Sequence, residues 1–196
     1  MENIVVSSTP HIRSKESVQS IMRDVIIALI PATVMGIVYF GMKALLLIAI
    51  SVASSVLFEM LYQKITKKTV TIDDLSAVVT GLLLALNMPV SASWWMPIVG
   101  SAFAIIIAKQ LFGGIGQNFV NPALIARAFL LASYPTAMTT WTVNDKTTAT
   151  PLAVLKTLKD GAAFADLDLP SLTQVITGKG IGGCIGETCA IALVIG

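Results

Sequence analysis

The sequence is poor in charge. Of its 196 residues, 12% are charged and 55% are hydrophobic, whereas about a quarter of the residues in a typical soluble domain are charged. A soluble fold of this length could not bury so much apolar surface. The net charge of +2 is small, and no basic run is interleaved with aromatic residues, as a nucleic-acid-binding face would require. We therefore expect an integral membrane protein with no nucleic-acid partner.

Metal-binding side chains are also scarce. The chain has one histidine, His11, and two cysteines, Cys184 and Cys189, which lie in an apolar stretch far from it. Zinc and iron–sulfur sites need further cysteine or histidine ligands, and a buried cysteine most often behaves as a small hydrophobic residue. The sequence therefore predicts no metal site.

The N-terminal region lacks the apolar core of a secretory signal, because residues 1–23 are mostly polar or charged. Residues 25–42 and 44–62 are then each long enough to span a bilayer, with Lys43 at the turn between them. Basic residues flank the outer ends of this pair. They are Arg13, Lys15 and Arg23 before it and Lys64, Lys67 and Lys68 after it. The positive-inside rule predicts that both ends are cytoplasmic.

The next apolar region, 75–108, has no charge and is too long for one span. It is interrupted at residues 87–89 (NMP), which divides it into a short helix, about 75–86, and a full span, about 95–109. A second short helix, 122–132, ends before Pro135. Short apolar segments that end at proline are typical of discontinuous membrane helices that line a midplane site. Their likeness is equally explained by chance in a leucine-rich sequence.

These segments predict an all-α, polytopic transmembrane protein with broken half-helices. A cytoplasmic extension (1–23) precedes a first membrane repeat (24–135), an extracytoplasmic segment (136–180) and the start of a second membrane repeat (181–196). The run 190–196 is shorter than the roughly 20 residues that a spanning helix needs. We therefore expect the chain to be a truncated piece of a longer protein.

A run of threonines, 147–150 (TTAT), follows Asp145 and precedes a helical pattern that begins at Pro151. Proline suits the first helical position and Thr150 the capping position before it. One interpretation is that Thr150 only caps this helix. The other is that a phosphate is esterified to its hydroxyl, since the positive end of a helix dipole stabilises a phosphate.

This run resembles the flavinylation site of the NqrB/RnfD family, whose members belong to the Rnf complex and to the sodium-pumping NADH:quinone reductase. Residues 8–11 (STPH), 112–122 (FGGIGQNFVNP) and 182–188 (GGCIGET) resemble the same family. The resemblance implies that Thr150 carries FMN through a phosphoester bond, which a separate flavin transferase installs. Asp145 lies one residue closer to the threonine than the family's usual acid, so Thr148 is the alternative attachment residue. The short N-terminal extension favours the RnfD branch of the family.

The resemblance also implies a urea-transporter-like fold with two inverted halves. The expected function is electron transfer within a ferredoxin:NAD oxidoreductase complex, the Rnf complex, that is coupled to Na+ or H+ translocation. Its location would be the prokaryotic cell membrane, with Thr150 on the outer side and NADH bound by other subunits. A second, non-covalent flavin such as riboflavin is implied as well. The alternative is a channel or solute transporter without a redox role.

Two isolated charges lie in apolar segments, where ionisable residues are costly unless they are paired or bind ions. Arg127 is the one charge between Lys109 and Asp145. It is expected either to contact the flavin or its phosphate, or to lie at a subunit interface or the membrane surface. Glu187 is expected either to belong to a cation pathway or to lie near a helix start, where the dipole favours a carboxylate.

Overall fold

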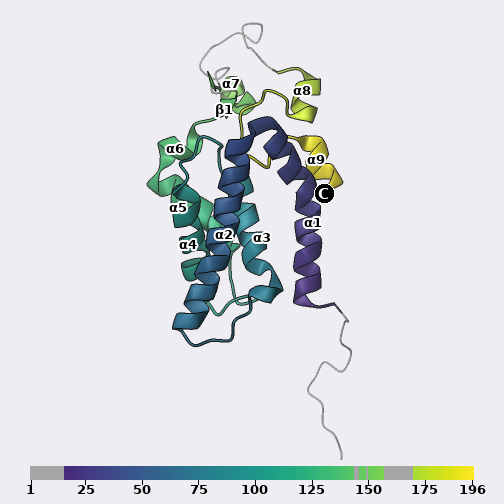
Figure 1. Ribbon diagram of the computed structural model, residues 1–196. Helices are drawn as coiled ribbons and strands as arrows, with labels where there is room; N and C mark the ends of the chain where they lie inside the picture. The colour runs from purple at the N-terminus through teal and green to yellow at the C-terminus, as the bar shows by residue number, and fades with distance from the viewer. Residues whose placement is uncertain (1–15, 144–145, 149, 157–169) are drawn as a thin grey trace, which may run out of the picture.

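The computed structural model describes residues 16–143, 146–148, 150–156 and 170–196. Helices dominate this part of the chain, and one hairpin of two-residue strands accompanies them (Figure 1). The predicted all-α class is therefore confirmed apart from the hairpin. Asp145 lies outside the described residues.

Two long helices begin the described chain, α1 (Val18–Phe40) and α2 (Met42–Ile65). The turn between them is at Gly41, with φ of 68°, and not at Lys43 as predicted, because only glycine adopts a positive φ without steric cost. Pro31 lies inside α1, and proline removes a helical hydrogen bond. The stretch Val18–Ile65 is the one described helical stretch that is long and apolar enough to cross a membrane, with a mean hydropathy of 2.3.

The short helix α3 (Ser76–Leu86) follows a 3-10 turn, η1 (Ile72–Asp74), and packs along α2. Close packing depends on Gly81, because a methyl group there would come within 2.8 Å of the Ser51 carbonyl oxygen. The Ser51 hydroxyl donates to the Gly81 carbonyl at 2.7 Å, and the Ser101 hydroxyl donates to the Ser51 carbonyl at 3.1 Å. The predicted helix 75–86 is thus confirmed, and it is buried at the centre of the molecule.

A helix is present at nearly the predicted bounds 95–109, but it is one of the shorter apolar helices and is not long enough to count as a membrane span. Its winding also differs from that of a regular α-helix. It begins as α4 (Met96–Ala102) and continues as a π-helix, η2 (Phe103–Gln110). After a glycine-rich loop comes α5 (Pro122–Ser133), close to the predicted 122–132. The Asn121 side chain begins α5 by accepting a hydrogen bond from the Ala123 N–H at 2.9 Å.

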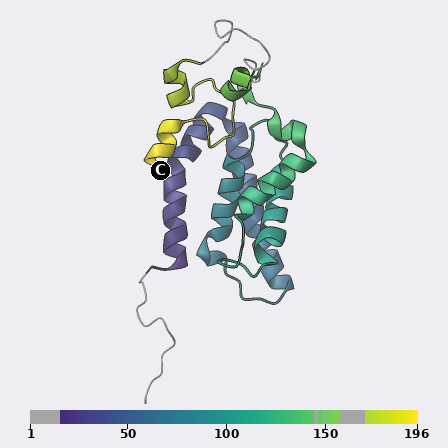
Figure 2. The same cartoon turned by 180° about the vertical axis from the view of Figure 1, so that it is seen from behind.

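The remaining elements gather at the end of the molecule that holds the α1–α2 turn (Figures 1 and 2). They are α6 (Pro135–Thr139), the strands β1 (Thr142–Val143) and β2 (Lys146–Thr147), α7 (Pro151–Lys156) and α8 (Leu172–Thr177). The last helix, α9 (Ala190–Ile195), lies against α1. The described parts of segment 136–180 therefore lie at the opposite end from the lysines that follow α2.

Candidate functional site

The two candidate attachment threonines have different surroundings. The Thr148 N–H donates to the Trp141 carbonyl at 2.9 Å, which places this residue just beyond the hairpin. Its Oγ1 is buried and has no hydrogen-bond partner among the described residues, and a methyl group on Gly182 would collide with it. Thr150 is half-buried and directly precedes α7, as the sequence predicted. Both threonines are thus half-buried as residues, and the Thr148 hydroxyl is itself enclosed.

The C-terminal end of the short helix α3 is hydrogen-bonded through its backbone to the glycine-rich segment 182–188. The Ile185 N–H donates to the Met88 carbonyl at 3.0 Å, and the Gly186 N–H donates to the Leu86 carbonyl at 2.9 Å. Pro89 and Cys184 form an isolated antiparallel bridge at the same point. These bonds satisfy backbone groups that the end of a helix leaves free. Two motifs that lie far apart in the sequence, the NMP break and the GGCIGET run, therefore form one junction.

Arg127, from the middle of α5, reaches this junction. Its Nη1 donates to the Asn87 Oδ1 at 3.0 Å, and its Nη2 lies 3.5 Å from the Cys184 Sγ. Glu187 also contacts Cys184, because its Oε1 accepts a hydrogen bond from the Cys184 N–H at 2.9 Å. Arg127 and Glu187 are thus brought to the same residue. Their hydrogen bonds within the described residues lie at this junction and not at the threonine run.

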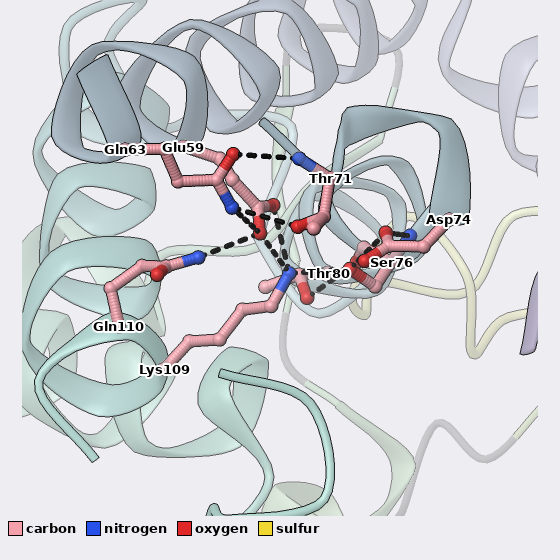
Figure 3. A network of polar contacts seen from close by, with 8 residues as sticks. All are labelled: Glu59, Gln63, Thr71, Asp74, Ser76, Thr80, Lys109 and Gln110. Atoms are coloured by element: carbon pink, nitrogen blue, oxygen red, sulfur yellow. Dashed lines mark hydrogen bonds and ion pairs between the residues drawn. The ribbon is translucent and has the colours of Figure 1, made fainter. Parts of the chain in front are cut away.

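A buried ion pair that was not predicted from the sequence connects α2 and η2 (Figure 3). The Lys109 Nζ lies 2.7 and 2.8 Å from the two carboxylate oxygens of Glu59, and the two side chains are 2% and 1% exposed. Nζ also donates to the Ser76 hydroxyl on α3. A buried charge is costly unless it is paired. The pair and the hydrogen bond to Ser76 therefore hold α2, η2 and α3 together.

Amide side chains complete the network around the carboxylate. The Gln110 Nε2 donates to the Glu59 Oε1 at 2.7 Å, and the Gln63 side chain bonds to both the N–H and the hydroxyl of Thr71, at 3.0 and 2.8 Å. A cavity of about 330 Å³ adjoins the network, and Lys68 and Asp74 are among its lining residues. The sequence did hold a signal for this pair, because Glu59 and Lys109 are isolated opposite charges at the ends of apolar helices.

Comparison with known proteins agrees with the resemblance in the sequence. The family model described as NQR2, RnfD, RnfE family matches residues 5–196. The D subunit of the Na+-translocating ferredoxin:NAD+ oxidoreductase complex of Acetobacterium woodii is 54% identical over 99% of this chain and 61% of its own length. The D subunit of the proton-translocating ferredoxin:NAD+ oxidoreductase complex of Clostridium ljungdahlii is 41% identical over 97% of this chain and 60% of its own length.

The D subunit of an ion-translocating oxidoreductase complex of Vibrio cholerae is 39% identical over 88% of this chain and 50% of its own length. The chain thus spans about 60% of the length of the first two relatives. The family and the long apolar stretch of α1 and α2 together indicate a membrane protein. On the extent of the match, the chain belongs to the NQR2, RnfD, RnfE family.

Proposed function

We propose that this protein is a membrane electron-transfer subunit that carries FMN on Thr150. It would act within a ferredoxin:NAD oxidoreductase complex that couples electron transfer to the movement of Na+ or H+. Support comes from the named activities of the relatives and from the position of Thr150 directly before helix α7. The observation that carries the proposal is the contrast between this residue and the enclosed hydroxyl of Thr148.

The residues around the threonine run fit a phosphoester at Thr150 and not at Thr148. A phosphate on Thr148 would have to displace Gly182, since there is no room even for a methyl group between this glycine and the hydroxyl. Thr150 is half-buried, two residues before the exposed Leu152, and a flavin transferase would have to reach its hydroxyl there. Bound FMN would supply electron-transfer chemistry, and this chain would hold the cofactor and limit its contact with water.

The proposed membrane arrangement is multi-pass, in the prokaryotic cell membrane. The start of α1 and the end of α2, with Lys64, lie at one end of the molecule, and α7 and α8 lie at the other (Figure 1). A cytoplasmic location of the basic end follows from the positive-inside rule and places Thr150 on the outer side. In this arrangement 24–135 is the first half of a urea-transporter-like inverted repeat, and 181–196 begins the second half.

Arg127 and Glu187 are assigned to the junction between α3 and the segment 182–188. A guanidinium has five N–H donors, and two of its groups already engage Asn87 and Cys184. Contact with a flavin would use the remaining donors. We retain Glu187 as an element of a cation pathway, because ionisable residues within membrane segments mark such pathways. Glu59 and Lys109 are also buried ionisable residues. Their presence supports the proposal that the protein takes part in ion translocation, for the same reason.

The proposed partners are the other subunits of the complex, a flavin transferase that acts on Thr150, and the lipid bilayer. A second, non-covalent flavin, such as riboflavin, also belongs to the proposal. NADH would bind to partner subunits. Residues 178–183 (GKGIGG) match the spacing of a dinucleotide fingerprint, but they follow the end of helix α8, whereas the fingerprint follows a strand and opens a helix.

The test of the proposal is the mass of the proteolytic peptide that contains Thr150, after co-expression with the natural flavin transferase. We expect the peptide to carry the mass of an FMN phosphoester in the wild-type protein and in Thr148→Val, and to lack it in Thr150→Val. Thr148→Val is the matched control, since it replaces a buried hydroxyl without a described partner by an apolar group of the same shape. An unmodified wild-type peptide would instead favour a channel or transporter without a redox role.

A further inference from the structure

Two adjoining cavities lie beside the α1–α2 turn. The first, of about 330 Å³, is lined by residues that include Tyr39, Phe40, Lys43, Val90 and Thr142. The second, of about 250 Å³, shares Lys43 and Val90 with the first and extends to Ser91 and Trp94. Binding sites for cofactors usually measure about 300 to 1,000 Å³. The two cavities together therefore have room for a planar tricyclic ring.

The first cavity presents slightly more polar than apolar surface, whereas the second is mainly apolar. Val38, Phe40 and Val90 supply apolar surface, and the Lys43 ammonium and the Thr142 hydroxyl supply hydrogen-bond donors. Lys43 is the one cation that lines both cavities among the described residues. An isoalloxazine ring has a matching distribution, with an apolar dimethylbenzene edge and an opposite edge of carbonyl and amide groups. The second cavity, mainly apolar with few polar groups, is of the kind typical of ligand pockets, and the first adds the polar side.

The hairpin brings the attachment residue close to the first cavity. Thr142, which lines the cavity, is the register partner of Thr147. Thr150 follows Thr147 by three residues, and three residues extend to at most about 11 Å. The ribityl chain between phosphate and ring adds further reach. The hairpin and α7 lie over the α1–α2 turn in both views of the molecule (Figures 1 and 2).

We propose that the isoalloxazine ring of FMN attached to Thr150 lies in the cavities beside the α1–α2 turn, with Lys43 at its polar edge. This inference rests on the proposed function. Lys43 would be a positioning and tuning residue, because an opposite charge within about 4–6 Å favours the charged form of a group. A flavin gains negative charge when it is reduced, so the lysine would favour the reduced state.

The test compares the midpoint potential of the covalent flavin between the wild type and variants of the full chain. Each protein is purified in detergent after co-expression with the transferase. Lys43→Met removes the charge and keeps the length, and Lys43→Arg keeps the charge. Lys64→Met is the matched control, because Lys64 is exposed at the opposite end of the same helix. We expect Lys43→Met to shift the ratio of reduced to oxidised flavin about tenfold toward the oxidised form, which lowers a two-electron potential by about 30 mV.

A second variant tests the location of the ring independently of Lys43. Met42 is 74% exposed and lines the first cavity, so Met42→Trp should place an indole against the flavin and quench its fluorescence. Leu61→Trp, at another exposed apolar position near the other end of α2, should leave the fluorescence unchanged.

The outcomes distinguish this inference from the proposed function. A potential lowered in Lys43→Met alone, with quenching in Met42→Trp alone, supports the ring site. A flavin that is present on the Thr150 peptide but keeps its potential and fluorescence in these variants overturns the ring site and leaves the proposed function standing. If the wild-type peptide carries no flavin, the proposed function fails and the ring site fails with it.

Discussion

At the scale of single residues, the Glu59–Lys109 pair is the most enclosed charged feature of the described chain. Such pairs are costly to form, because both ions lose their hydration, but removing one partner is costlier, since the other charge stays buried alone. Here both carboxylate oxygens face the ammonium. Gln110, on the same helix as Lys109, and Ser76, on α3, supply further hydrogen bonds.

We expect Lys109→Met to destabilise the protein by about 3–5 kcal/mol, because it leaves the Glu59 carboxylate buried without a cation. The double variant Glu59→Gln/Lys109→Met should recover part of this loss, since no charge then remains in the network. Thermal unfolding of the detergent-solubilised protein is the measurement. Lys64→Met, an exposed substitution on α2, should stay within about 0.5 kcal/mol of wild type. A Lys109→Met protein that melts with the wild type would contradict this account.

Individual site residues were predictable from the sequence to different degrees. Thr150 at the start of a helix followed from local pattern, because capping depends on neighbouring residues only. The pairing of Glu59 with Lys109 was not predicted, since it joins residues 50 positions apart. The partners of Arg127 were missed for the same reason, because they come from the end of α3 and from segment 182–188.

At the scale of elements, the existence and order of the helices were predictable, and their winding was not. Apolar runs and prolines predicted α3, the α4–η2 helix and α5 within one or two residues. The π-helical turn in η2 has no local sequence signal. It lies where Lys109 and Gln110 both bond to Glu59, and π-helical turns are common at such special positions.

The contact between α2 and α3 gives a prediction at this scale. We expect Gly81→Ala to destabilise the protein by about 1–3 kcal/mol, because the new methyl group would meet the Ser51 backbone oxygen at 2.8 Å and overpacking has this cost. Gly100→Ala is the matched control. Its nearest neighbour, at 2.8 Å, is the flexible end of the Leu130 side chain, which can move. Equal melting temperatures for the two variants would contradict the prediction that the contact between α2 and α3 at Gly81 has no room for a methyl group.

At the scale of the whole molecule, the sequence predicted which elements share an end. Basic residues flank the α1–α2 pair on one side, and the polar segment 136–180 was assigned to the other. The structure places α7 and α8 at the end of the molecule opposite to the C-terminal end of α2 (Figure 1), and Lys64 lies in the last turn of α2. The lateral arrangement was not predictable, because α9 packs on α1 across more than 150 residues of sequence.

The proposed orientation can be tested with a thiol reagent that does not cross membranes. We expect Val175→Cys, at an exposed position of α8, to react in intact cells. Lys64→Cys, at an exposed position of α2, should react only after the cells are opened. The wild type is the control, since its two cysteines are buried. Reaction of Lys64→Cys in intact cells would reverse the orientation.

The junction of α3 with segment 182–188 has a consequence for how the protein is made. A ribosome that adds about 5–20 residues per second delivers Cys184 roughly 5 to 20 seconds after Pro89. During that interval the Leu86 and Met88 carbonyls lack the partners that they have in the finished chain, and lipid cannot replace those partners. In the proposed membrane arrangement, the nascent chain must therefore keep the end of α3 in contact with water or with the insertion machinery until the glycine-rich segment arrives.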